Sequence, residues 1–307
     1  KTWRTHVNIP YYRTIFFMAL IPRNVPSFPA NSVLRGGRLT KWKGQVGGLS
    51  PHIGALSAGV SLSAFAVSMA LGGGLLLAPM AAAQTVTLSG AQTTTQPPSP
   101  SATPLVVVTD STFSVVNATG DALVLTGTNG TSFTDLFNST ITGATYGILA
   151  INSGTGALSV TTTGAVTGTG GSGIGAIGKG LTISAAAVSG NLNGIFAKGN
   201  GGALSVTTTG AVTGTSSIGI RAYSYGTNMT VSAAAVSGGI DGISADNRGT
   251  GALSVTSTGA VTGTSGAGIY ARNVSTSTSL TISAAAVTGA TEGIYASNYG
   301  TGTLSVT

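Results

Sequence analysis

The sequence predicts an all-β fold, a right-handed parallel β-helix (β-solenoid) with turns of about 24 residues. A Leu-x-Val/Ile marker recurs from Leu158 to Leu304 with spacings of 23 to 27 residues, and Phe133 begins a poorer copy. Each copy contains short β-forming runs that alternate with period two, and none has a helical period. One copy cannot bury its apolar side alone, whereas stacked copies can, and parallel crossovers favour the right hand.

Charge and composition exclude several functional classes for the repeat region. The chain has 307 residues with 13 basic and 6 acidic side chains, but from Gln84 onward the counts are 5 and 6. The basic excess therefore belongs to the first part of the chain and does not predict a nucleic-acid partner. Both histidines precede Gln84 and the chain has no cysteine. Ser-His-Asp or Cys-His catalysis, zinc fingers and disulfides are excluded from the repeats.

Residues 1–83 are predicted to be a basic leader with an export signal. A basic region precedes the apolar run 60–78, and the small residues Ala81 and Ala83 place signal cleavage before Gln84. The alternative is an uncleaved transmembrane helix, which the glycines of the run and the proline after it disfavour. Because the chain begins with Lys, we expect it to be a fragment or to have a different start.

Two further segments follow the leader. Residues 84–112 are predicted to be a disordered linker, because the stretch 91–104 is polar, rich in Pro and Thr, and without apolar period. Residues 113–307 are predicted to be the β-helix repeats, truncated at the C-terminus because the chain stops inside a copy.

Alignment of the copies sorts residues into columns that repeat from turn to turn. The Gly-Ile-x-Ala segments place isoleucine and alanine in two columns that should face the core: Ile148, Ile174, Ile195, Ile220, Ile243, Ile269 and Ile294, and Ala150, Ala176, Ala197, Ala222, Ala245, Ala271 and Ala296. The residues between and after them should face solvent. Two residues further on, Asn152, Asn247, Asn273 and Asn298 are predicted to form a structural ladder of side-chain amides, and asparagine also tolerates the left-handed conformation of a tight turn.

The repeats resemble the passenger domains of Gram-negative autotransporters (type V secretion), through the alternating LSVTTTGAVTG and ISAAAVSG units with Gly-Ile-Tyr-Ala segments. The resemblance covers about residues 84–307 and extends to the long basic leader. It implies export through the inner membrane to the cell surface or outer membrane, or secretion. It also implies an outer-membrane β-barrel translocator as partner, absent from this chain. Since the acidic residues are scattered, the function that we expect is that of a non-catalytic structural or adhesive stalk.

One strand of each copy carries nearly all the large side chains and is the candidate partner face. From Leu158 onward every basic and aromatic residue falls in the Gly-Ile-x-Ala segment or the turn after it, which suits a host or neighbouring-cell glycan or protein. The alternative is a solvated strand whose polar variety keeps the protein soluble. We expect a cation–π contact of Phe196 with Arg221 and stacking of Tyr270 on Tyr295, with Tyr223 on the same face.

Other chemistry is weakly supported by the sequence. The acidic residues are too scattered for a glycan-cleaving pair, although Asp241 and Glu292 share one column, and no metal or cofactor is predicted. A polysaccharide-cleaving β-helix enzyme and a freely secreted repeat protein remain the alternative functions. The triplets 161–163, 207–209 and 256–258 are similar to an ice-binding array, but Ala triplets at 185–187, 233–235 and 284–286 interrupt it.

Overall fold

The computed structural model describes residues 83–96 and 104–307, and every regular element within them is a β-strand. The predicted leader, its export signal and Ala81 lie outside the described residues. Within the described ranges, no helix is long and apolar enough to cross a membrane.

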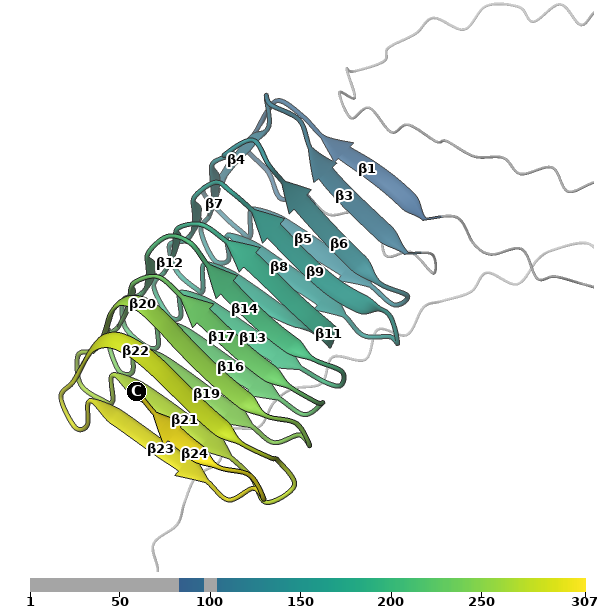
Figure 1. Cartoon of the computed structure of the whole chain (residues 1–307). Coiled ribbons are helices and arrows are strands. Elements are labelled where there is room, and N and C mark those ends of the chain that lie inside the picture. The colour runs from purple at the N-terminus through teal and green to yellow at the C-terminus, as the bar shows by residue number, and fades with distance from the viewer. Residues whose placement is uncertain (1–82, 97–103) are drawn as a thin grey trace, which may run out of the picture. The chain divides into compact units, whose positions relative to one another are not determined.

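The strands stack into a parallel β-solenoid of about nine turns (Figure 1), as the repeat predicts. Three ladders run along it, and each strand pairs in parallel with its equivalent in the next turn. The first ladder carries the Leu-x-Val marker, the second Val-Thr/Ser-Gly and the third Ile-x-Ala. Paired residues of the first ladder are 21 positions apart at Gln84 and Leu105 and 27 apart at Leu253 and Leu280.

Three long strands each serve two ladders. The second half of β11 (Ile174–Ala185) belongs to the first ladder and its first half to the third, whereas β20 (Leu253–Gly263) and β22 (Leu280–Gly289) serve the first and second.

The remaining strands each belong to one ladder. The first ladder contains β1 (Gln84–Leu88), β3 (Leu105–Thr109), β6 (Thr131–Asp135), β9 (Ala157–Thr162), β14 (Leu204–Thr208), β17 (Met229–Ala233) and β24 (Leu304–Val306). The second contains β2 (Ala91–Gln92), β4 (Ser114–Asn117), β7 (Ile141–Gly143), β10 (Val166–Gly168), β12 (Val188–Gly190), β15 (Val212–Gly214) and β18 (Val236–Gly238). The third contains β5 (Leu123–Gly127), β8 (Ile148–Asn152), β13 (Ile195–Gly199), β16 (Ile220–Ser224), β19 (Ile243–Asn247), β21 (Ile269–Asn273) and β23 (Ile294–Asn298).

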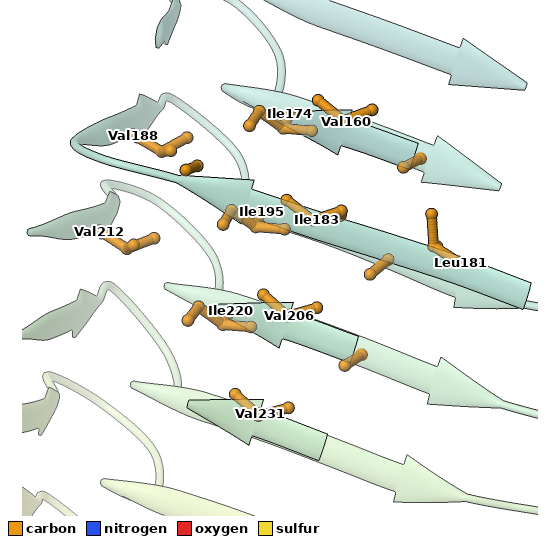
Figure 2. Close-up of a cluster of buried hydrophobic side chains, with 14 of the residues drawn as sticks. Val160, Ile174, Leu181, Ile183, Val188, Ile195, Val206, Val212, Ile220 and Val231 are labelled. Carbon is orange, nitrogen blue, oxygen red and sulfur yellow. The ribbon is translucent and has the colours of Figure 1, made fainter. Parts of the chain in front are cut away.

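The core is a thin column of branched side chains along the inside of the ladders. In Figure 2, Val206 of the first ladder lies beside Ile220 of the third, and Val212 of the second lies further along the same turn. The predicted isoleucine and alanine columns are confirmed, because their members from Ile148 to Ala271 are fully buried. Ile294 and Ala296 of the last complete turn are partly buried.

The glycine before each core isoleucine from Ile148 to Ile269 is required by close packing between turns. A Cβ atom on Gly194 would lie 2.5 Å from Cγ1 of Val212 and 2.7 Å from the carbonyl oxygen of Gly219. Such distances leave no room for a side chain. The Gly-Ile pair therefore repeats because the valine of the following turn occupies the space that a side chain would need.

The disordered linker predicted for 84–112 is wrong where the structure describes it. Strand β1 pairs with β3, and β3 pairs with β6, so the solenoid begins near Gln84 and not at residue 113. Leu105 and Val107 are buried in the same core as the later repeats. These strands form because the next turn supplies hydrogen bonds and an apolar partner that the polar composition does not reveal.

The predicted register of the first poor copy is also wrong, by two residues. Phe133 pairs with Val160, and Thr131 takes the place opposite Leu158. A shift of two keeps the same side chains inward, because the strand period is two. Asp135 consequently lies opposite Thr162 and not at a valine position.

Candidate functional site: a basic and aromatic face

The candidate site is the outward side of the third ladder together with the turn after each strand. Equivalent residues in successive turns form three columns there, because the strands pair without a register shift. We call this surface the basic–aromatic face; it consists of Phe196, Arg221, Ser244, Tyr270 and Tyr295, then Lys198, Tyr223, Asp246 and Arg272, and in the turns Lys179, Tyr225, Arg248 and Tyr299.

All five basic side chains of the described ranges lie on this face. They come from five successive turns, one from each: Lys179, Lys198, Arg221, Arg248 and Arg272. Neighbouring turns are about 4.8 Å apart, so the five span roughly 19 Å along the solenoid. The charge of the repeat region, nearly neutral in total, is therefore sharply segregated in space.

Three of these cations gather around two tyrosine rings. The guanidinium carbon of Arg221 lies 5.1 Å from the ring centre of Tyr223, and that of Arg248 lies 5.8 Å from the same ring. Arg248 is also 5.9 Å from the Tyr225 ring centre, where Lys198 Nζ lies at 5.6 Å. The negative ring faces partly compensate the mutual repulsion of the cations.

Arg221 is also held by hydrogen bonds. Its Nε and one terminal nitrogen donate to the hydroxyl oxygen of Tyr223, at 2.8 and 2.6 Å. The ring of Phe196 meets the Tyr223 ring edge to face, with centres 6.4 Å apart. These contacts fix the direction of the arginine side chain before any partner binds.

Asp246 is the single acidic residue of the basic–aromatic face, and two arginines share it. Arg248 Nε donates to its carboxylate at 2.7 Å, and Arg272 donates through Nε at 3.1 Å and a terminal nitrogen at 3.0 Å. Hydrogen bonds with Asp246, and then its charge, raise the pKa of both arginines. Within the described ranges these are the only ion pairs, so Lys179, Lys198 and Arg221 have no carboxylate partner.

The predicted stacking of Tyr270 on Tyr295 is confirmed. Their ring centres are 4.9 Å apart and their planes differ by 3°. Burial raises the pKa of the Tyr270 phenol, and the positive charge of Arg272 opposes that rise. Tyr295 is exposed at the outer side of this pair.

The predicted cation–π contact of Phe196 with Arg221 is wrong. The two residues pair in adjacent strands, but the arginine turns along its own strand to Tyr223, whose hydroxyl group it can reach. The sequence analysis placed Tyr223 on this face, where the structure also has it, but it assigned no role to Asp246 or Tyr225. The repeat could have indicated both, because they lie in the columns two and four residues after the column of Phe196 and Arg221.

The asparagine ladder is confirmed for three of its four predicted members. Asn247 donates to Asn273 and Asn273 donates to Asn298, each at 3.1 Å. Asn152 lacks such a partner, because Gly127 and Gly178 occupy its column in the adjacent turns, and it donates only to the carbonyl of Gly156. None of the four has a left-handed backbone, since among described non-glycine residues only Asn138 has a positive φ.

Of the five acidic residues outside the basic–aromatic face in the described ranges, four accept hydrogen bonds that hold local structure, among them Asp135 and Asp241. Asp135 is fully buried and accepts hydrogen bonds from the hydroxyls of Thr109 and Ser139, both at 2.7 Å. Burial alone raises its pKa, but the hydrogen bonds, led by Ser139, outweigh burial and lower the pKa. Asp241 accepts from the backbone N–H of Ala267 at 2.9 Å. The described ranges contain no group of three or more His, Cys, Asp or Glu side chains that could hold a metal.

The outward side of the first ladder is an uncharged hydroxyl face. The predicted alanine interruption is shifted by one residue: Ala185 pairs with the buried Thr162 and Thr208, so alanine interrupts the outward position of Thr163 and Thr209 and not that of Thr161 and Thr207. Two unbroken rows of hydroxyls point outward, and none of them bonds to another protein group: Ser159, Thr182, Ser205, Thr230, Ser254 and Thr281, and Thr161, Ser184, Thr207, Ser232, Thr256 and Ser283.

Comparison with known proteins gives no match: no protein-family model, no curated protein and no solved structure matches this chain.

Proposed function

We propose that this chain is an exported passenger of the autotransporter class, a non-catalytic β-solenoid stalk that presents the basic–aromatic face to a partner. One observation carries the proposal: the five basic side chains of the described ranges lie on one face, from five successive turns. Random placement for solubility would distribute them over all three ladders. Arginine and tyrosine are also favoured at binding surfaces.

The proposed location and partners follow from the sequence resemblance. The stalk is carried to the cell surface by an outer-membrane β-barrel, and it contacts a glycan or protein of a host or neighbouring cell. The alternatives are a β-helix enzyme acting on polysaccharide and a freely secreted repeat protein. The roles of Asp246 in ion pairs and of Asp241 in a turn favour a binding surface over a cleavage site.

A cell-adhesion assay tests the recognition role. Cells that display the chain should bind their target surface, and the combined substitution Arg221→Ala, Tyr270→Ala and Tyr295→Ala should weaken that binding. The melting midpoint should stay within a few degrees of the parent, because these side chains lie outside the core. Equal adhesion of the two proteins would show that the face is only a solvated strand.

A second candidate function, ice binding, is favoured by the hydroxyl face of the first ladder. Its rows repeat at about 4.8 Å between turns and about 6.6 Å along each strand. Such a rigid array of hydroxyl and methyl groups favours ordered water. Inhibition of ice recrystallisation should be lost on Thr161→Lys with Thr207→Lys and kept on the control Thr167→Lys, on the second ladder. An inactive parent protein would refute this function.

A further inference from the structure

We propose that the ligand of the basic–aromatic face is a linear anionic polysaccharide, laid along the solenoid axis. This inference rests on the proposed recognition role and names the chemistry of its partner. The strip carries five positive charges and one negative charge over five turns. Such a strip matches a polymer that repeats a carboxylate or sulfate group along its length.

The unpaired cations are the first argument for an external anion. Lys179, Lys198 and Arg221 have no carboxylate partner in the described ranges. Lys198, Arg221 and Arg248 instead surround the rings of Tyr223 and Tyr225 within 6 Å of a ring centre. An anion placed among them would relieve their mutual repulsion.

The spacing of the cations is the second argument. Each turn adds one cation about 4.8 Å further along the axis. The five come from three columns, so they form a zigzag row along the axis, with Lys198, Arg221 and Arg248 drawn together at the tyrosine rings. A polyuronate or sulfated glycan also presents its anionic groups at regular intervals along an extended chain. A compact ligand such as free phosphate would use only one or two members of this row.

Polar groups beside the cations suit the hydroxyls of a sugar. Lys179 lines an open depression of about 300 Å³ together with Ser153, Thr155 and Asn200, at one end of the row. At the other end lie the stacked Tyr270 and Tyr295, whose phenol hydroxyls can donate and accept hydrogen bonds, and Tyr295 is exposed. The bound chain would therefore meet hydrogen-bonding groups at both ends of the charged segment.

The test is the binding of the purified chain to heparin and polygalacturonate, with dextran as the neutral polysaccharide. We expect binding to both anionic polymers, weakening as salt is added, and none to dextran. The combined substitution Lys179→Gln, Lys198→Gln and Arg221→Gln breaks no ion pair and should reduce affinity about tenfold. The matched control Thr182→Glu, Thr230→Glu and Thr281→Glu changes net charge equally on the first ladder and should leave affinity near that of the parent.

Three results would overturn this assignment. Equal loss in the strip variant and the charge-matched control would mean that net charge alone drives binding. Unchanged binding in the strip variant would place the site elsewhere. Tighter binding of single-stranded DNA than of either polysaccharide would assign the strip to nucleic acid. The polysaccharide-binding assay needs neither export nor cells, so it is independent of the cell-adhesion assay. If the chain binds neither anionic polymer but its adhesion to cells still depends on the strip, the polysaccharide is refuted as the ligand and the recognition role of the face stands.

Discussion

The side-chain amide of Asn247 donates to the side-chain oxygen of Asn273 across adjacent turns, with 3.1 Å between nitrogen and oxygen. Both residues are fully buried, and each also donates to a carbonyl in the loop that follows its own strand. Asn247 donates to the carbonyl of Gly251, and Asn273 donates to that of Ser279. The ladder thus holds each turn in shape and joins it to the next. Buried amides that are satisfied in this way stabilise the corner where the third ladder gives way to the first.

Removal of the central ladder amide should destabilise the solenoid. Asn273→Ala removes the hydrogen bonds that its amide donates to the Ser279 carbonyl and to the Asn298 side chain, and we expect a loss of roughly 2 kcal/mol in the free energy of unfolding. Asn152→Ala is the control, because its side-chain oxygen already lacks a partner. Denaturant unfolding measures both. An equal loss in the two variants would mean that the hydrogen bond between adjacent solenoid turns adds no stability beyond that of the hydrogen bond within the loop.

A charge in the core column should unfold the neighbouring turns. Val206 and Ile243 are fully buried, and neither Val206→Asp nor Ile243→Asp provides a partner for the new carboxylate. We expect a cost of several kcal/mol for either substitution. Circular dichroism and the melting midpoint measure the effect, with the outward neighbours Ser205→Asp and Ser244→Asp as controls. A β-rich spectrum and midpoint equal to those of the parent would contradict the inward assignment.

The buried carboxylate of Asp135 should make stability depend on pH. Its folded-state pKa is lowered, so the ionised group stabilises the fold above its ordinary pKa of about 3.9. This contribution is lost as pH falls below about 4, through the folded-state pKa. Asp135→Asn should lower the free energy of unfolding by roughly 2 kcal/mol at neutral pH, because an amide accepts fewer of the converging hydrogen bonds.

Thermal melts of parent and Asp135→Asn over a pH series measure this dependence. The difference between the two proteins should shrink below about pH 4, as the parent carboxylate becomes protonated. Glu292→Gln is the control, since Glu292 is exposed. A difference that stays constant across the series would show that ionisation of Asp135 does not contribute.

The mature exported protein should begin at Gln84. This residue opens the first described strand, and its backbone N–H donates to the carbonyl of Pro104 at 2.8 Å. Cleavage there would leave the solenoid intact from its first strand. N-terminal sequencing of exported material measures the position, and a start upstream of Leu71 would contradict the prediction.

The sequence by itself determined the solenoid and most of its inward columns. A period near 24 residues with two-residue alternation has few other ways to bury apolar side chains, so the repeat alone assigns Ile195 and Val206 to the core, where both are fully buried. The stacking of Tyr270 on Tyr295 followed for the same reason, because equivalent positions in adjacent turns are one strand spacing apart.

Only the tertiary structure decided the contacts that depend on side-chain direction or on weak copies of the repeat. Strand β1 forms because β3 supplies its hydrogen bonds, although the composition around it indicates a linker. Arg221 turns to Tyr223 and not to Phe196, because a long flexible side chain follows the nearest acceptor and not the column. Asp246 joins Arg248 and Arg272 by the same principle. Backbone register is set by the repeat, whereas the partners of long side chains are set by what lies within reach once the turns are stacked.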